Sequence, residues 1–316
     1  MLKIAAIVGP TAVGKSKIAV EVAGIIGAEI ISADSVQVYK GMNIGAAKIT
    51  LEESYTTDGN FIPHHMLDIV EPDVQYSVAD YKNAVEKLIP EILGRNKLPL
   101  LVGGTGLYIQ AIIDPYQFEP IPTDWEYRKE LHREAEVKGN EHVHGKLALV
   151  DPVTAARLHP NDLRRVIRAL EVFKATGRPI WAQHRVGKEK SRYNLSIIGL
   201  TMPRELLYKR IDERVEQMIA QGFITEVENL LAAGYSCELP AMQSLGYKQI
   251  CLYLNGKCTL EEAVSLIKRD TRRFAKRQLT WFKRDHRIKW YELTADTDKN
   301  RLAAEIATEI GRTINT

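Results

Sequence analysis

A glycine-containing segment near the beginning of the chain limits the folds that it can adopt. It reads Gly9-Pro10-Thr11-Ala12-Val13-Gly14-Lys15-Ser16 and matches the pattern G-x-x-x-x-G-K-[ST] at every fixed position. An apolar run at residues 4–8 precedes it and predicts a buried strand, while residues 15–26 carry apolar side chains at helical spacing. Backbone N–H groups and the positive end of a helix then face one point. The sequence therefore predicts a phosphate-binding loop, with Lys15 on terminal phosphate oxygens and Ser16 on Mg²⁺.

The order of the segments that follow predicts an α/β fold. Short apolar strands are expected at residues 29–32 and 98–102, with a helix over residues 78–93 between them. This alternation favours a P-loop NTPase-like parallel sheet flanked by helices. Residues 116–192 differ from the preceding segments because they contain prolines and polar helical stretches in place of apolar strands. We interpret them as a helical insertion. The core domain would then be discontinuous, formed by residues 1–115 and 193–316.

Composition and cysteine usage narrow the class of protein further. The net charge of +3 over 316 residues is too small to imply a nucleic-acid partner by itself. The three cysteines are odd in number and lack a C-x-x-C spacing, which argues against a disulfide framework or a zinc site. No apolar run approaches the length of a membrane span, so we expect a cytoplasmic protein without a membrane partner.

Two polar side chains follow expected strands and should lie at the carboxyl edge of the sheet, where α/β proteins bind ligands. They are Asp34, after residues 29–32, and Thr105, in the Gly103-Gly104-Thr105-Gly106 turn. An aspartate before serine can equally be a turn cap, and this glycine-rich turn can be only a tight connection. An ATPase would normally place a second magnesium-binding acid after another strand. The strand at 98–102 has none, which weakens the ATPase interpretation.

Several blocks together resemble the tRNA dimethylallyltransferase family, the isopentenyl diphosphate:tRNA transferases of bacterial type. Besides the phosphate loop, the matching segments are residues 31–42 (ISADSVQVYKGM), 43–48 (NIGAAK), 63–65 (PHH), 101–108 (LVGGTGLY), 161–171 (NDLRRVIRALE) and 277–282 (RQLTWF). They occur in family order from residue 9 to about residue 285. The resemblance therefore covers nearly the whole chain.

The resemblance implies the substrates and the roles of the site residues. The substrates would be dimethylallyl diphosphate, with Mg²⁺, and the adenine 3′-adjacent to the anticodon in tRNAs that read codons beginning with U. Asp34 would act as general base, Thr105 would bond near the ester oxygen of the diphosphate, and Arg214 or Arg210 would clamp that diphosphate. The extruded adenine would be held by the loop of Ser35, Val36 and Gln37, and His64 would be a polar group of the active site that contacts the tRNA.

A run of cations at residues 268–289 predicts an RNA-binding surface. Arg269, Arg273 and Arg277 recur every four residues and would form one stripe on a helix, with a second stripe at Lys268, Arg272 and Lys276. Trp281 and Phe282 would offer stacking faces for unpaired bases, and Gln278 would join them at the RNA. Arg164, Arg165 and Arg168 would form a second patch in the insertion, which we expect to contact the anticodon stem-loop.

Two other functions remain open at this point. One is a small-molecule kinase that uses the loop for ATP and Asp34 to activate an alcohol. The other is an RNA-binding protein whose phosphate loop has lost its task. The sequence does not determine the oligomeric state, and a monomer is our working expectation.

Overall fold

The computed structural model describes residues 1–115, 121, 123–180 and 193–314. The chain divides into two compact units. One comprises Met1–Ile113 together with Ser191–Thr316, and the other comprises Asp114–Lys190. No helix in the described ranges is both long enough and apolar enough to cross a membrane.

The larger unit is built on a six-stranded sheet in the order β3-β2-β4-β1-β5-β6, and every neighbouring pair of strands is parallel. The phosphate-loop strand lies inside the sheet, with Ala5 opposite Leu100 on one side and opposite Ser196 on the other. The strands are β1 (Leu2–Val8), β2 (Ala28–Ala33), β3 (His64–His65), β4 (Leu98–Gly103), β5 (Tyr193–Thr201) and β6 (Ile288–Glu292). The sequence analysis missed β3 and β6.

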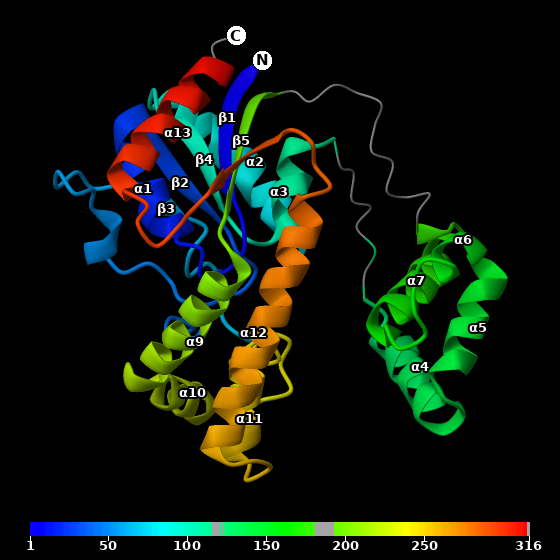
Figure 1. Cartoon of the computed structure of the whole chain (residues 1–316). Coiled ribbons are helices and arrows are strands. Elements are labelled where there is room, and N and C mark those ends of the chain that lie inside the picture. The colour runs from blue at the N-terminus through cyan, green and yellow to red at the C-terminus, as the bar shows by residue number, and fades with distance from the viewer. Residues whose placement is uncertain (116–120, 122, 181–192, 315–316) are drawn as a thin grey trace. The chain divides into compact units, whose positions relative to one another are not determined.

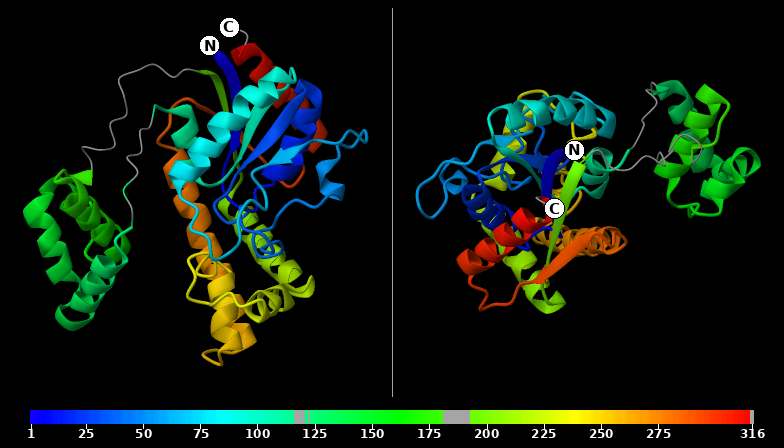
Figure 2. Two further views of the ribbon diagram at one scale, coloured as in Figure 1. Left: turned by 180° about the vertical axis from the view of Figure 1, so that it is seen from behind. Right: turned by 90° about the horizontal axis from the view of Figure 1, so that it is seen from above.

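Helices cover both faces of this sheet (Figures 1 and 2). On one face, α1 (Lys15–Ile26) and α13 (Lys299–Ile314) pack against each other and share an apolar core with the strands. On the other face, α2 (Val78–Gly94) and α3 (Gly106–Ile113) share a second core. Burial on both sides explains why β2 and β4 are buried along their whole lengths. The expected parallel sheet flanked by helices is confirmed.

A helical lobe continues the larger unit beyond the carboxyl ends of the strands. It contains α9 (Arg204–Ala220), α10 (Phe223–Ala232), α11 (Tyr247–Leu254) and α12 (Leu260–Phe282), and a 3-10 turn, η1 (Glu52–Ser54), lies in the long connection after β2. Val38, Tyr39 and Met42 from that connection are buried in one core with α10 and α11. The segment that begins at Asp34 is therefore anchored on the lobe.

The smaller unit has its own apolar core. The helices described within residues 123–180 are α4 (Trp125–Lys138), α5 (Asn140–Val150), α6 (Pro152–Ala155) and α7 (Leu163–Thr176). The buried carboxylate of Glu171 accepts hydrogen bonds from Arg128, Arg168 and the Asp124 N–H. This pairing satisfies a charge that would otherwise be costly to bury.

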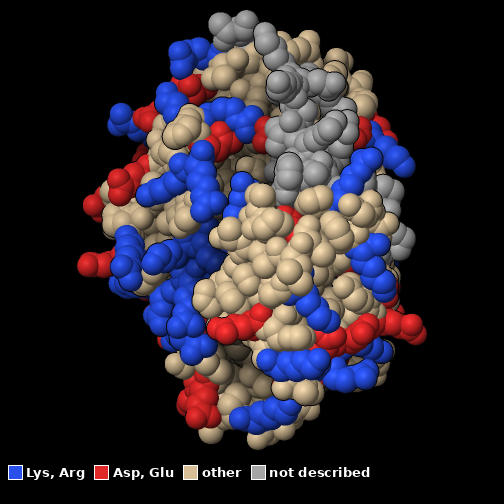
Figure 3. Space-filling model, turned by 90° about the vertical axis from the view of Figure 1, so that its right-hand side faces the viewer, with Lys and Arg blue, Asp and Glu red and all other residues tan. Residues whose placement is uncertain are grey.

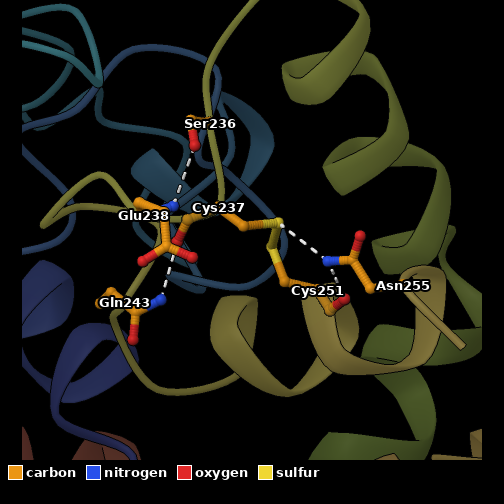
Figure 4. Close-up of a disulfide and its surroundings, with 6 residues drawn as sticks. All are labelled: Ser236, Cys237, Glu238, Gln243, Cys251 and Asn255. Carbon is orange, nitrogen blue, oxygen red and sulfur yellow. Dashed lines mark hydrogen bonds between the residues drawn. A yellow bond between two sulfur atoms is a disulfide. The ribbon is translucent and has the colours of Figure 1, made fainter. Parts of the chain in front are cut away.

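A disulfide joins Cys237, in the connection before α11, to Cys251 on that helix, with their Cα atoms 6.0 Å apart (Figure 4). The expectation of no disulfide is therefore wrong. The two cysteines meet because the connection before α11 lies against that helix. The number of cysteines in the sequence does not predict this contact. Gln243 Nε2 donates to the Cys237 carbonyl at 2.7 Å, and Asn255 Nδ2 donates to the Cys251 carbonyl at 2.8 Å. Cys258 is a free thiol.

Candidate active site

The phosphate-binding loop runs from the end of β1 into the first turn of α1. Gly9 and Gly14 have φ angles of 148° and 99°, which glycine adopts at little cost. A Cβ on Gly9 would also lie 2.4 Å from the Leu200 carbonyl oxygen of β5, so glycine is required there for close packing as well. Val13 is fully buried. One side of the loop therefore packs against β5 and the core, and its other side faces solvent.

Lys15 is the first residue of α1, and its ammonium donates to the Pro10 carbonyl oxygen at 2.7 Å. Burial, and to a smaller extent the nearby Arg214 cation, lower the pKa of Lys15 to about 7 against the opposing effect of the Asp34 carboxylate. An anion placed in the loop would favour the charged ammonium. The environment of Lys15 is therefore suited to a ligand that brings negative charge.

A cleft of about 760 Å³ opens above this loop. Thr11, Ala12, Gly14, Lys15 and Ser16 line it, whereas Gly9, Pro10 and Val13 lie beneath it. Asp34, Gln37, residues 43–44 and 46–50, Gly103, Gly104 and several residues of α9 and α12 line the remainder. The structure thus brings the phosphate loop and the end of β2 into one cavity.

Asp34 and Thr105 lie on adjacent turns at this edge of the sheet, since β2 and β4 are neighbours. The Ser35 N–H donates to Thr105 Oγ1 at 3.2 Å, and the Thr105 N–H donates to the Ala33 carbonyl at 3.1 Å. Asp34 Oδ1 accepts from the Val36 N–H at 2.9 Å. Asp34 is therefore a turn cap and a cleft residue at once, and its second carboxylate oxygen is available to a ligand.

Gln37 lines the cleft, but protein groups engage both ends of its amide. Its Oε1 accepts from Ser32 Oγ at 2.8 Å, and its Nε2 donates to the carbonyls of Ala46 and Ala47 at 3.2 Å. Ser35 is exposed and Val36 is half-buried against the lobe core. Gln37 thus fastens the segment after Asp34 to the next loop.

Glu226 on α10 holds that next loop and was missed by the sequence analysis. Its carboxylate accepts from the backbone N–H groups of Asn43, Ile44 and Gly45 at 2.6–3.1 Å, and from the Tyr247 hydroxyl at 2.7 Å. An acid on an amphipathic helix gives no sign of these backbone partners, because they lie about 180 residues away in sequence. Glu226 fixes one wall of the cleft.

Cations from three elements surround the cleft. Arg214 and Arg210 both project from α9 into it, and Arg210 Nη1 donates to the Val13 carbonyl at 3.4 Å. Burial lowers the pKa of Arg214, while Asp34 and Glu53 oppose the change. Lys17 and Lys299 line the same cleft, and the pKa of Lys299 is lowered by burial and then by Lys17 and Arg210. This accumulation of like charge favours an anionic ligand.

His64 lies apart from the other predicted site residues. It belongs to β3, its Nδ1 is 2.8 Å from the Ile62 carbonyl, and burial lowers its pKa. It borders a small adjoining cavity of about 30 Å³ that also touches Ser16 and Gln37, and it does not line the larger cleft.

The cationic helix α12 differs in detail from the expected surface. Arg269, Arg273 and Arg277 are exposed, as a solvent-facing stripe requires. In the second stripe, Lys268 pairs with Glu216 at 2.6 Å and Arg272 with Asp212 at 2.9 Å, so these two cations join α12 to α9. Figure 3 shows a face of the molecule on which Lys and Arg side chains gather in one region.

The aromatic residues at the end of α12 are core residues. Phe282 is only 3% exposed, which contradicts its expected role as a stacking face. Trp281 is half-buried and packs so closely on α3 that a Cβ on Gly106 would lie 2.2 Å from its ring. Gln278 is buried too, and its amide is bonded to the backbone of the Thr11 and Gly104 segments. The apolar face of α12 faces the sheet, which explains all three placements.

In the smaller unit, the predicted arginines lie together on α7. Arg164 and Arg165 are exposed, with Arg165 3.2 Å from Asp162. Arg168 pairs with the buried Glu171. Arg168 is therefore held by a buried acid, whereas Arg165 pairs with an acid at the surface and Arg164 is exposed.

The residues present fit a magnesium ion bound chiefly through phosphate. Ser16 is exposed in the cleft, and its hydroxyl has no protein partner in the part of the chain that the structure describes. Mg²⁺ commonly takes one or two protein oxygens and fills its other positions with phosphate oxygens and water. Ser16 would supply one such oxygen.

The parallel sheet, the loop at the end of β1 and the cation-rich cleft define a P-loop protein whose cleft is suited to an anionic ligand. The IPP transferase family model matches residues 37–285. The tRNA dimethylallyltransferase of Moorella thermoacetica is 54% identical over 99% of this chain and 96% of its own length. That of Symbiobacterium thermophilum is 51% identical over 96% and 94%.

Solved structures agree. The full-length tRNA isopentenylpyrophosphate transferase of Bacillus halodurans is 45% identical, with a TM-score of 0.74 over 100% of this chain and 97% of that one. A eukaryotic dimethylallyltransferase acting on tRNA is 27% identical, with a TM-score of 0.78 over 99% and 79%. The chain belongs to the IPP transferase family, and it is an enzyme of the prenyltransferase class. The resemblance drawn from the sequence is confirmed.

Proposed function

We propose that this chain transfers the dimethylallyl group of dimethylallyl diphosphate to the exocyclic amine of an adenine in tRNA and releases diphosphate. The adenine would be the one 3′-adjacent to the anticodon in tRNAs that read codons beginning with U. The observation that carries the proposal is that the phosphate loop and Asp34 line one cleft. That cleft offers cations for the leaving group and a carboxylate for the incoming amine.

The loop side of the cleft would stabilise the departing diphosphate. As the allylic C–O bond breaks, negative charge grows on the diphosphate oxygens, and donors aimed at that charge lower the barrier. The Lys15 ammonium, the loop N–H groups and the Arg214 guanidinium are placed to supply them. Bound at Ser16, Mg²⁺ would neutralise further charge on the phosphates. Arg210 is tied to the loop carbonyl of Val13, so we assign the clamp to Arg214.

The Asp34 side would receive the nucleophile. The lone pair of an adenine amine is delocalised into the ring, so its proton becomes acidic only as the new C–N bond forms. Asp34 would take that proton late in the step. Thr105, bonded to the Ser35 N–H, would place its hydroxyl near the ester oxygen. The base must leave its stack to reach this cleft, and Ser35, Val36 and Gln37 would border its pocket.

The outer face of α12 would hold the RNA backbone. Arg269, Arg273 and Arg277 are exposed on it, and clustered cations of this kind neutralise phosphates. Arg164 and Arg165 of the smaller unit would add contacts to the anticodon stem-loop. We do not assign RNA contacts to four other predicted residues, because each side chain is already bonded to or packed against another part of the protein. They are His64, Arg168, Gln278 and Trp281. The enzyme would act as a monomer in the cytoplasm.

One assay separates this function from its alternatives. The protein is incubated with unmodified tRNA and labelled dimethylallyl diphosphate, and in parallel with labelled ATP, and the tRNA is digested to nucleosides. Prenylated adenosine is the expected product, and it should disappear with Lys15→Ala. Phosphate transfer from ATP without prenyl transfer would favour a kinase. An RNA-binding protein would bind tRNA equally well with and without Lys15.

A further inference from the structure

One buried amide connects the cationic helix to both turns at the floor of the cleft. Gln278 on α12 is 6% exposed. Its Oε1 accepts from the Thr11 N–H of the phosphate loop at 2.8 Å, and its Nε2 donates to the Gly104 carbonyl, in the turn after β4, at 3.0 Å. Both ends of the side chain are therefore committed to backbone groups that lie 267 and 174 residues away in sequence.

The packing of α12 leaves no room for a side chain at Gly104 or Gly106. A Cβ on Gly104 would lie 2.1 Å from Gln278 Nε2, and a Cβ on Gly106 would lie 2.2 Å from the Trp281 ring. Neither glycine has a positive φ angle. Close approach of α12, rather than backbone conformation, is therefore the reason that these positions are glycine.

We propose that Gln278 is a positioning residue, which sets the phosphate loop at a fixed distance from the turn that carries Thr105. The inference rests on the proposed function, since it concerns the geometry between the diphosphate and the groups on the opposite side of the cleft. Thr11 belongs to the loop and Thr105 follows Gly104 directly, so one amide holds both partners. Misplacement of reacting groups by about 1 Å can cost about 10²-fold in rate.

The same helix carries the exposed cations on its other side. Arg277 and Arg273, one and five residues before Gln278, are exposed, while Gln278 is buried against the Thr11 and Gly104 backbone. RNA bound to the exposed arginines would therefore contact the same helix that, through Gln278, positions the phosphate loop and the turn after β4. This assigns Gln278 to the inside of the enzyme, in place of the RNA contact expected from its sequence block.

The test measures diphosphate binding and RNA binding separately. Gln278→Met keeps the length of the side chain and removes both hydrogen bonds. We expect the Kd for inorganic diphosphate with Mg²⁺, measured by calorimetry, to rise about tenfold, and kcat for prenyl transfer to fall about 10- to 100-fold. The Kd for unmodified tRNA should stay within about twofold. Thr280→Ala, an exposed position on the same helix that does not reach the cleft, is the matched control for diphosphate binding and should leave that Kd unchanged.

Gln278→Glu adds a readout that a merely structural residue would not give. Its carboxylate can still accept from Thr11, but it faces the Gly104 carbonyl oxygen with a negative charge instead of a donor. Protonation restores an O–H donor. Diphosphate binding by this variant should therefore recover, relative to the wild type at each pH, as the pH is lowered.

Two further measurements protect the test against simple misfolding. The Thr11 amide should lose hydrogen-exchange protection in Gln278→Met while the amides of α1 keep theirs. Gly104→Ala should weaken diphosphate binding, because the new methyl meets Gln278 Nε2. Shortening Gln278 to Ala leaves the Gly9 carbonyl, at 3.4 Å, as the nearest atom. The double variant should thus be no worse than Gln278→Ala alone.

Unchanged diphosphate binding in Gln278→Met would overturn the proposal. Loss of tRNA affinity with normal diphosphate binding would do the same, and would return Gln278 to the RNA surface. Failure of the proposed function would look different, because the wild type would then bind diphosphate and tRNA without forming prenylated adenosine.

Discussion

Asp34 combines two tasks that a single substitution can separate. Its Oδ1 caps the turn at Val36 while the side chain lines the cleft. Asp34→Asn keeps an oxygen for the cap and removes the base, so it should fold normally and lower kcat by about 10²- to 10⁴-fold. Asp34→Ala should lose the cap as well, and with it some thermal stability. Single-turnover rates and melting curves test this, and a near-normal rate for Asp34→Asn would remove Asp34 from the role of base.

Lys15 gives the ligand-free enzyme a measurable pH dependence. Burial lowers its pKa to about 7, so the ammonium loses its proton as the pH rises through that value. Diphosphate needs the charged form, and its affinity should therefore fall with rising pH, approaching about tenfold per unit well above pH 7. Calorimetry between pH 6 and pH 9 measures the trend. Lys15→Met should bind weakly and, after correction for ionisation of diphosphate, without this dependence.

The stability of the ligand-free protein should change in the opposite sense. The pKa of Lys15 in the fold is lower than its ordinary value of 10.5, so the unfolded chain holds the proton more firmly. Between about pH 7 and 10.5 the contribution of Lys15 to the free energy of unfolding therefore increases with pH. Denaturant titrations of wild type and Lys15→Met across this window should diverge accordingly.

For single residues, the sequence predicted the positions of the phosphate loop, Asp34 and Thr105, but it did not predict the distant residues that hold these segments in place. The phosphate loop, Asp34 and Thr105 each depend on a few consecutive residues at the end of a strand, and the structure places them at one edge of the sheet. The partners of Gln278 and the backbone partners of Glu226 depend on how distant segments meet. No local pattern contains that information.

Among the elements, α10 supports the cleft through Glu226. Glu226→Ala would leave three backbone N–H groups and the Tyr247 hydroxyl without their acceptor, at a cost of about 1–3 kcal/mol in the free energy of unfolding. The loosened loop at residues 43–47 should also raise the KM for tRNA. Glu228→Ala, an exposed acid on the same helix, is the control. Equal behaviour of the two variants in denaturant titration would contradict this account.

The two sides of α12 predict different responses to salt. Affinity for tRNA should fall steeply with salt concentration, because exposed arginines displace counterions from phosphates. Arg273→Ala and Arg277→Ala should each reduce the slope of log Kd against log salt by about 1. Lys268→Ala should leave the slope nearly unchanged, since that side chain pairs with Glu216. Binding titrations at several salt concentrations show whether the paired cation Lys268 binds RNA together with the exposed arginines or whether the exposed arginines alone do so.

Element prediction succeeded where the apolar pattern was long and failed where it was short. α2 was recognised to within one residue at each end because its apolar spacing persists over several turns. β3 has two residues, β6 alternates without an apolar run, and α11 spans eight residues after a glycine. α5 has exposed apolar side chains that blur its periodicity. In each case tertiary contacts, rather than propensity, define the element.

For the molecule as a whole, the disulfide is a separate source of stability. It closes a loop of 14 residues in sequence separation, which restricts the unfolded chain. Cys237→Ser or full reduction should lower the free energy of unfolding by about 2–4 kcal/mol. Cys258→Ser, at the free thiol, is the control and should behave as wild type. Denaturant titrations with and without reductant compare the variants, and an unchanged midpoint on reduction would contradict the prediction.

The larger unit is assembled from two separate stretches of chain. β1 lies between β4 from the first stretch and β5 from the second, and α1 packs against α13 near the other end of the sequence. Neither stretch contains the whole sheet, so neither should fold alone. The sequence supported this arrangement only through the prolines and polar helical stretches of residues 116–192, which indicated an insertion, because no local pattern encodes strand order.

The bond between Cys237 and Cys251 also changes what limited proteolysis would reveal. A cut at any peptide bond between these two positions divides the polypeptide in two, yet the halves stay covalently joined. The nicked species would migrate as one band on a non-reducing gel and as two bands once thiol is added.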